Sequence, residues 1–169
     1  LMVVARTRQT MDALVKQIAA REVKRQYVAV SDKPWEGTKQ KSIDLPIGRD
    51  PSNRLRMATV DLTKNSGKLA LTHLHLLDQN PQGALVRCIL ETGRTHQIRV
   101  HMASQKMPLL GDTVYGGALT PFIGRQALHA EQLAFEHPVT HESMSFKSPL
   151  PHDFTKLLEA RSLSYNEKV

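Results

Sequence analysis

One short stretch of this chain, residues 91–102, combines ionisable and apolar side chains at helical spacing. At roughly 100° per residue, Ile98, Val100 and Met102 share one broad apolar arc of a helix, and Arg99 falls inside that arc rather than opposite it. A guanidinium is not buried alone, because an unpaired buried charge is costly and arginine does not escape by losing its proton. The sequence therefore predicts that Arg99 meets a carboxylate or a phosphate, which is the first sign of a functional site.

The residues around this stretch predict a strand, a tight turn and a helix. Residues 84–90 alternate as in a strand, Gly93 permits a sharp turn, and Thr95 is placed to cap a helix that runs to about Ser104. We therefore expect Arg99 in a helix that follows directly on a strand.

The remaining elements predict an α/β (α+β) domain with a mainly antiparallel mixed sheet flanked by helices. Met11, Leu14, Val15 and Ile18 form the apolar face of the first helix, and the leucines after Lys68 do not keep one parity, which predicts a bulge or burial on both faces near Thr72 and His73. The tail, residues 162–169, is expected to be frayed. The expected helices cover residues 7–22 and 151–160; the expected strands cover 24–30, 43–47, 126–135, 143–147 and an antiparallel meander of 55–60, 68–77 and 83–90.

Composition and charge favour a one-domain protein that binds nucleic acid. The chain has 169 residues, a net charge of +7 and a pI near 9.8, which suit an acidic partner, most commonly nucleic acid. Cys88 is the only cysteine, so a disulfide within the chain is excluded and a reducing, cytoplasmic setting is expected, with Cys88 as a small buried hydrophobe rather than a nucleophile. No stretch approaches membrane-spanning length, so we expect no membrane partner.

Residues 91–102 (ETGRTHQIRVHM) and 108–117 (PLLGDTVYGG) closely resemble the third block of the ribosomal large subunit pseudouridine synthases of the RluA/RluD type. Residues 21–30 resemble the tyrosine strand of that family, and residues 128–130 and 135–138 resemble its closing strand. The resemblance implies a partial pseudouridine synthase catalytic domain over residues 1–161. It also implies a monomer in bacterial cytoplasm that acts on RNA, most often 23S-type ribosomal RNA, without a metal or an organic cofactor.

One block of the family is missing. Its catalytic aspartate lies in a His-Arg-Leu-Asp segment that closely precedes a strand of the Leu-Met-Val-Val-Ala type, and this chain begins with that strand at Leu1. We therefore expect an excised piece of a longer enzyme that is inactive alone. The alternative is a non-catalytic RNA-binding module with the same fold.

The implied reaction breaks the N-glycosidic bond of uridine, turns the uracil and rejoins it through C5, in a pocket that holds a flipped base. By resemblance Arg99 pairs with the missing aspartate, whose attack on ribose or base stays open. Tyr27 by resemblance stacks on the uracil and accepts the C5 proton through its phenol. Ile98 and Leu128 would line the pocket. Each has a plainer alternative: Arg99 reaching solvent, Tyr27, Ile98 and Leu128 filling the core.

Other polar residues divide between RNA contacts and structural support. Arg94 is placed to meet an RNA phosphate beside the helix start, with a solvated surface arginine as the alternative, and His96 with Gln97 is expected to make supporting hydrogen bonds. His96 and His101 point apart on a helix, so no metal site is predicted. By resemblance Asp112 is a turn residue and not the nucleophile, and Trp35 is expected in the core rather than stacked on RNA. The expected basic rim for phosphates comprises Arg21, Lys24, Arg25, Lys39, Lys41, Arg49, Arg54 and Arg56.

Overall fold

The computed structural model of the chain describes residues 1–166. In that part the chain forms helices and strands close to those expected from the sequence. The helices are α1 (Arg8–Ala19), α2 (Gln97–Ser104), α3 (His152–Ala160) and the short 3-10 helix η1 (Thr113–Tyr115); the strands are β1 (Lys24–Ser31), β2 (Gln40–Asp44), β3 (Ile47–Arg49), β4 (Met57–Thr59), β5 (Gly67–Lys68), β6 (Leu71–Asn80), β7 (Gly83–Leu90), β8 (Leu128–Glu136) and β9 (Ser143–Lys147).

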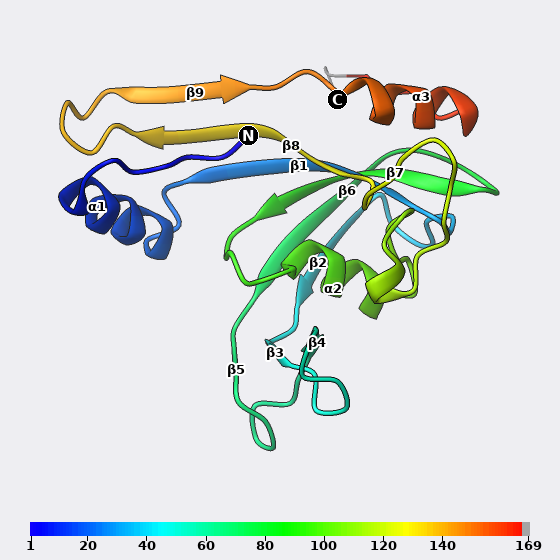
Figure 1. Ribbon diagram of the computed structural model, residues 1–169, viewed down its shortest axis with the longest axis horizontal. Helices are drawn as coiled ribbons and strands as arrows, with labels where there is room; N and C mark the ends of the chain where they lie inside the picture. Colours follow the sequence, from blue (N-terminus) through cyan, green and yellow to red (C-terminus); the bar gives the residue numbers. More distant parts are fainter. Residues whose placement is uncertain (167–169) are drawn as a thin grey trace.

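Two antiparallel sheets organise the molecule, as Figure 1 shows. The larger has six strands in the order β2-β6-β7-β1-β8-β9, and the smaller has the order β4-β3-β5. Helix α2 lies between them: its Val100 packs with Ile47 and Ala70, while Ile98 and Met102 pack against the large sheet. The predicted α+β class is therefore confirmed, and α2 is held on both sides.

The expected meander is wrong at its first strand, because β4 pairs with β3 in the small sheet and not with β6. Gly48 of β3 and Gly67 of β5 lie opposite each other. A Cβ at Gly48 would overlap the carbonyl oxygen of Ser66, so two glycines allow a backbone approach that larger residues would block. This close contact holds β3 and β5 together in the small sheet.

The large sheet carries a core on each face, because successive side chains of a strand point to opposite sides. On β1, Ala29 and Tyr27 contact the core that includes α2, whereas Val28 and Val30 contact the core that includes Phe154 of α3. The face that Tyr27 shares with α2 is thus fixed by strand parity.

Helix α1 begins where expected, but fewer of its apolar side chains are buried than expected. Thr7 caps it, with its Oγ1 accepting a hydrogen bond from the Thr10 amide at 3.2 Å. Of the predicted apolar face only Leu14 is buried, while Met11 and Val15 are 48% and 57% exposed. The helix lies at one end of the sheet (Figure 1), so only a narrow stripe of it reaches the core.

The irregularity of β6 lies further along than expected. Of the two alternatives expected near Thr72 and His73, the bulge is absent there, since both residues pair regularly with β2 and β7; the register shifts between Leu76 and Asp78. Leu76 packs into the core beside α2 and Leu77 into the core beside α3, so leucines of both parities are buried without a bulge at Thr72.

The remaining aromatic and C-terminal expectations concern Trp35 and the tail. Trp35 is 5% exposed and its Nε1 donates to the Thr38 carbonyl at 2.7 Å, so its place in the core is confirmed. Leu163, in the stretch expected to fray, is buried against α3, and residues 167–169 lie outside the described part. Among residues 1–166, every helix is too short or too polar to span a lipid bilayer.

His101 of α2 predicts a pH dependence of stability. Its Nε2 lies 2.9 Å from the Leu45 carbonyl oxygen and its Nδ1 2.9 Å from Thr72 Oγ1, so the neutral ring donates to the first and accepts from the second. Burial lowers the pKa of His101, although the Leu45 hydrogen bond and Asp44 act in the other direction. A lowered pKa means that the unfolded chain takes up the proton first, so stability is full above the ordinary histidine pKa and is lost as pH falls below it.

Urea unfolding between about pH 8 and pH 5 measures this loss. His101→Gln, which cannot take up the proton, should give a smaller decline towards pH 5 than the unsubstituted chain. Equal declines for the two proteins would show that His101 does not contribute.

Candidate active site

A cavity of about 240 Å³ beside the start of α2 joins side chains from distant parts of the sequence. Its wall comes from β1, β7, the segment that leads into α2, and the start of β8. Every residue of this lining was a candidate site residue predicted from the sequence, except Leu90 and Gln126. The expected residues in the wall are Tyr27, Arg94, His96, Gln97, Ile98, Arg99 and Leu128.

A β-bulge aims Tyr27 into this cavity. Gln26 pairs with Gln132 of β8, but Tyr27 pairs with Ala130, so Glu131 is an extra residue in the ladder. Leu128 lies two residues before Ala130 and therefore on the same face of β8. The bulge thus places the Tyr27 ring and Leu128 in one wall.

The Tyr27 phenol is protonated at neutral pH. Burial raises its pKa, and the nearby Arg25 opposes that rise. Within residues 1–166 no hydrogen bond to the hydroxyl is found, so the ring offers the cavity an apolar face and an O–H group that a ligand can engage.

Arg99 forms a buried, two-point ion pair with Asp112. Arg99 Nε lies 2.7 Å from Asp112 Oδ2, and Nη2 lies 2.7 Å from Oδ1. The two side chains are 13% and 1% exposed, and the guanidinium carbon lies 4.8 Å from the centre of the Tyr115 ring. The hydrogen bonds to Asp112 raise the pKa of Arg99, while burial opposes this. The expectation that a buried Arg99 needs an anionic partner is confirmed.

Asp112 leaves part of the guanidinium unused. The pair engages Nε and Nη2, whereas Nη1 has no hydrogen bond within residues 1–166. The side chains that line the cavity in residues 1–166 include no carboxylate. Arg99 lines the cavity, and its Nη1 remains available for a further hydrogen bond.

The sequence identified Asp112 as a turn residue but missed its ion pair. The turn is present: the Asp112 carbonyl accepts from the Tyr115 amide at 3.2 Å and the Gly117 amide at 2.8 Å. The one available signal was the buried arginine itself, which required a carboxylate of unknown position.

Tyr115, whose ring lies against the Arg99 guanidinium, was also not predicted from the sequence. Its hydroxyl accepts from the Met57 amide at 3.1 Å, so its own proton is donated to His96 Nδ1 at 2.8 Å. Burial, followed by the nearby Arg99, lowers the pKa of His96, which is consistent with a neutral ring that accepts this bond. His96 therefore connects the cavity wall to the support of Arg99.

Helix α2 begins one residue later than expected. The predicted Thr95 cap is wrong: His96 occupies the cap position in the left-handed conformation, with φ 56°, and no side-chain cap is present. The buried Gln97 side chain instead makes the hydrogen bonds that hold the turn before the helix. Its Oε1 accepts from the Arg94 amide at 2.9 Å and Thr92 Oγ1 at 2.8 Å, and its Nε2 donates to the Leu71 carbonyl and Thr72 Oγ1. Gln97 thus fixes the turn that carries Arg94.

Arg25 and Arg94 converge on Gly93. A Cβ on Gly93 would overlap Arg25 Nη1, so the glycine makes room for that guanidinium. Arg25 Nη2 donates to the Glu91 carbonyl at 3.4 Å, and Arg94 Nε donates to the Leu69 carbonyl at 2.9 Å. Burial lowers the pKa of Arg25, and Arg94 adds to this because like charges repel.

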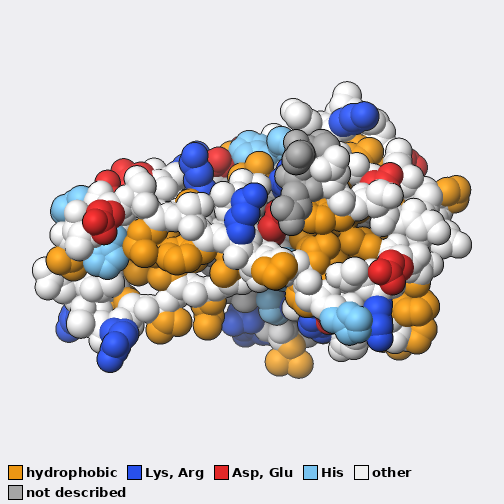
Figure 2. Space-filling view, turned by 90° about the horizontal axis from the view of Figure 1, so that it is seen from above, with side chains coloured by type: hydrophobic (Ala, Val, Ile, Leu, Met, Phe, Trp, Pro, Cys, Tyr) orange, Lys and Arg blue, Asp and Glu red, His pale blue; other side chains and the backbone are white. Residues whose placement is uncertain are grey.

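The rest of the expected rim is less concentrated. Lys24 is exposed at the start of β1, and Arg56 is paired with Asp50 at 2.6 Å. Figure 2, which views the molecule from above, shows blue side chains scattered among acidic and apolar ones. Of the residues expected to bind RNA, Arg25 and Arg94 lie together at Gly93, and Arg49 Nη1 donates to the Arg54 carbonyl at 3.4 Å. No cluster of three or more His, Cys, Asp or Glu suited to a metal ion occurs in residues 1–166.

Comparisons with known proteins agree on one family. Residues 1–104 match the family described as RNA pseudouridylate synthase. Ribosomal large subunit pseudouridine synthase D of Neisseria meningitidis serogroup B is 44% identical, over 96% of this chain and 45% of the relative. The enzyme of that name from Xanthomonas campestris pv. campestris is 45% identical, over 94% of this chain and 50% of the relative.

A solved structure supports the same fold. Human RNA Pseudouridylate Synthase Domain Containing 1 superposes with a TM-score of 0.72 and 26% identity, covering 88% of this chain and 63% of that structure. The present chain spans about half the length of the curated relatives it matches.

Proposed function

Because this chain belongs to the RNA pseudouridylate synthase family, we propose that its Tyr27 and Arg99 cavity is part of an active site that isomerises uridine in RNA to pseudouridine. One observation carries the proposal: a buried arginine, fixed by Asp112 through Nε and Nη2, lines the same mainly apolar cavity as Tyr27. In the wider protein the reaction would take place on structured RNA.

The cavity suits a flipped uracil. Its volume of about 240 Å³ equals roughly eight water volumes, which fits a small flat ring. Tyr27, Ile98 and Leu128 give apolar surface on which a base can stack, and stacking contributes about 1–3 kcal/mol per base. Arg94 stands at the edge, where it can meet a phosphate of the same strand.

The nucleophile is an aspartate from outside the described lining. Arg99 Nη1 would hold that carboxylate ionised and aimed, since a nearby positive charge favours the charged form. Asp112 would keep the guanidinium in place while the second carboxylate binds. By family resemblance the aspartate belongs to a His-Arg-Leu-Asp segment.

Tyr27 serves first as a stacking surface. Its raised pKa keeps the phenol protonated, so it accepts the C5 proton of uracil only after giving up its own. Stacking of the Tyr27 ring on the uracil does not require the phenol to lose its proton. His96 and Gln97 support the site through their hydrogen bonds to Tyr115 and to the α2 turn.

The relatives indicate the substrate. Two of them are named for the ribosomal large subunit, so we propose large-subunit ribosomal RNA, of the 23S type, as the RNA modified. A monomer in bacterial cytoplasm, without a metal or an organic cofactor, completes the proposal.

Tritium release from RNA labelled at C5 of uridine tests this function. We expect no release from the present chain alone, because its cavity wall supplies no carboxylate in residues 1–166. We expect release from an extended chain, in which the segment preceding the matched region of the Neisseria meningitidis relative is joined to Leu1. Asparagine in place of the aspartate of that segment is the control and should abolish the release. Turnover by the present chain alone would contradict the proposal.

The lining of the Tyr27 cavity also supports a second candidate function, that of a non-catalytic RNA-binding module, because RNA binding needs no nucleophile. An extended chain that binds RNA but releases no tritium would favour this candidate.

A further inference from the structure

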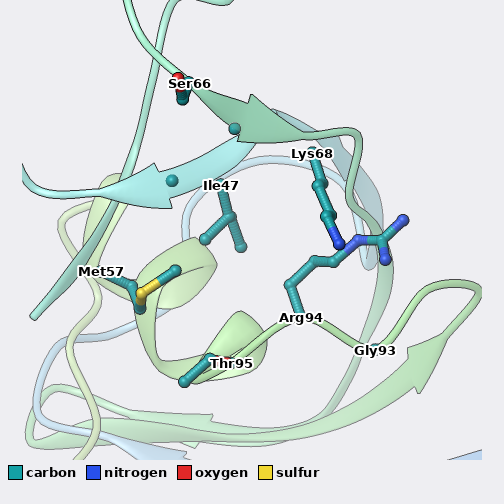
Figure 3. Close-up of a pocket in the computed structure, with 9 residues that line it drawn as sticks. Ile47, Met57, Ser66, Lys68, Gly93, Arg94 and Thr95 are labelled. Atoms are coloured by element: carbon teal, nitrogen blue, oxygen red, sulfur yellow. The ribbon is translucent and has the colours of Figure 1, made fainter.

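A second cavity, of about 430 Å³, lies on the other side of the turn that leads into α2. The small sheet forms one wall and residues 93–95 form the other, as Figure 3 shows. Ile47 and Met57 supply apolar surface, while Lys68 and Arg94 reach toward each other from opposite walls (Figure 3). The cavity therefore pairs an apolar interior with two cations.

The two cations are held in different ways. Arg94 Nε donates to the Leu69 carbonyl at 2.9 Å, which fixes the guanidinium beside the strand that bears Lys68. Lys68 is exposed and pairs across the sheet with Ile47, and its side chain has no hydrogen bond or ion pair within residues 1–166. Its ammonium group is thus available to a ligand.

Arg94 lines both this cavity and the Tyr27 cavity. It therefore stands on the partition between them, with Arg25 against Gly93 on one side and Lys68 on the other. Arg25 Nε is buried without a hydrogen-bond partner in the described chain, and Glu91 is the acidic group that acts on this arginine. Arg25 and Arg94 repel each other, Lys68 lies on the other side of the turn, and a polyanion that crosses the turn would be attracted by all three cations.

We propose that this second cavity binds the nucleotide next to the target uridine, with its base beside Ile47 and Met57 and its phosphate on Lys68 and Arg94. The inference rests on the proposed function, because it takes the Tyr27 cavity as the place of the target base. Proteins that read RNA commonly splay successive bases of a single strand into separate pockets. A phosphate on the partition would join the two pockets along one strand.

Binding of a labelled RNA hairpin to the present chain tests the proposal by fluorescence anisotropy. The hairpin carries one uridine in its loop, and two further versions carry an abasic residue immediately before or after it. Lys68→Ala should weaken binding about tenfold and lower the slope of log affinity against log salt by about 0.7, the value for one phosphate contact to a single strand. Lys156→Ala, an exposed lysine of α3, is the charge-matched control and should leave both unchanged.

Thr95→Trp tests the base pocket separately. Thr95 is exposed in the cavity wall, so a tryptophan there fills the space and leaves every charge in place. It should weaken binding of the intact hairpin about tenfold and bind one of the two abasic versions as the unsubstituted chain does. Thr95→Ser is the control for loss of the threonine itself.

Tyr27→Ala separates this inference from the function on which it rests. If Tyr27→Ala weakens binding while Lys68→Ala and Thr95→Trp do not, the second pocket is overturned and the proposed function stands. If the unsubstituted chain does not bind the hairpin, both are overturned. Equal weakening by Thr95→Trp for all three hairpins would also overturn the base pocket.

Discussion

Replacing Arg99 by methionine is expected to lower the rate of uridine isomerisation by about a thousandfold, the loss typical of removing a preorganised charged donor at a reacting centre. The extended chain defined above is the protein to use. Arg99 would hold the aspartate through Nη1, and methionine keeps similar bulk but offers no charge. Single-turnover tritium release at saturating RNA measures the chemical step apart from binding.

Two companion variants make the result specific. Arg99→Lys keeps the charge but loses the two-point pair with Asp112, so it should recover only part of the rate. Arg99→Met combined with Asp112→Leu removes the carboxylate that the single change leaves unpaired, and it should fold well yet stay slow. A rate within tenfold of the unsubstituted protein for Arg99→Met would contradict the role given to Arg99.

Replacing Asp112 by alanine is expected to lower the free energy of unfolding by about 4 kcal/mol, because it leaves a buried guanidinium without its counter-ion. A domain of this size is commonly stable by about 5–15 kcal/mol, so the loss should be evident in the urea midpoint. Circular dichroism of the present chain in urea measures it.

The chain offers a matched control for this change. Arg125 and Asp153 also form a two-point pair, at 3.0 and 3.1 Å, but each side chain is 37% exposed. Asp153→Ala should therefore lower the free energy of unfolding by only about 1 kcal/mol. Equal losses for Asp112→Ala and Asp153→Ala would show that burial of the Arg99 pair has no special effect.

The double variant Arg99→Met with Asp112→Leu completes the cycle. Replacing a buried ion pair with apolar residues is often neutral, so the double variant should regain most of the stability lost by Asp112→Ala. Loss as large as in the single variant would locate the effect in the Asp112 turn rather than in the ion pair.

Local sequence patterns predicted best those features of the site that depend on a single helix or strand. The helical spacing placed Arg99 among apolar residues, and the structure confirms its burial and its need for a carboxylate. The alternating pattern placed Tyr27 on a strand, but parity alone did not show that a bulge at Gln26 would aim it at the cavity. That depends on Glu131 in a strand far along the chain.

Features that arise from long-range contacts were missed. Asp112 follows Arg99 by 13 residues across an irregular connection, so no periodicity relates them. Gln97 replaces the expected Thr95 cap because its amide reaches Leu71 and Thr72 of β6, a contact invisible to local capping rules. The small sheet was missed for a similar reason, since a two-residue strand such as β5 has no detectable alternation.

Mapping where a uridine binds on this chain shows whether the cavity of Tyr27 and Arg99 is the base-binding site. The present chain, labelled with ¹³C and ¹⁵N, would be titrated with a short RNA hairpin that carries one uridine in its loop, and the shift changes of assigned side chains followed by NMR. We expect the largest changes on the Tyr27 ring, the Arg99 Nε–H group and the methyl groups of Ile98 and Leu128. Changes confined to other faces of the molecule, with Tyr27 and Arg99 unaffected at saturation, would contradict this expectation.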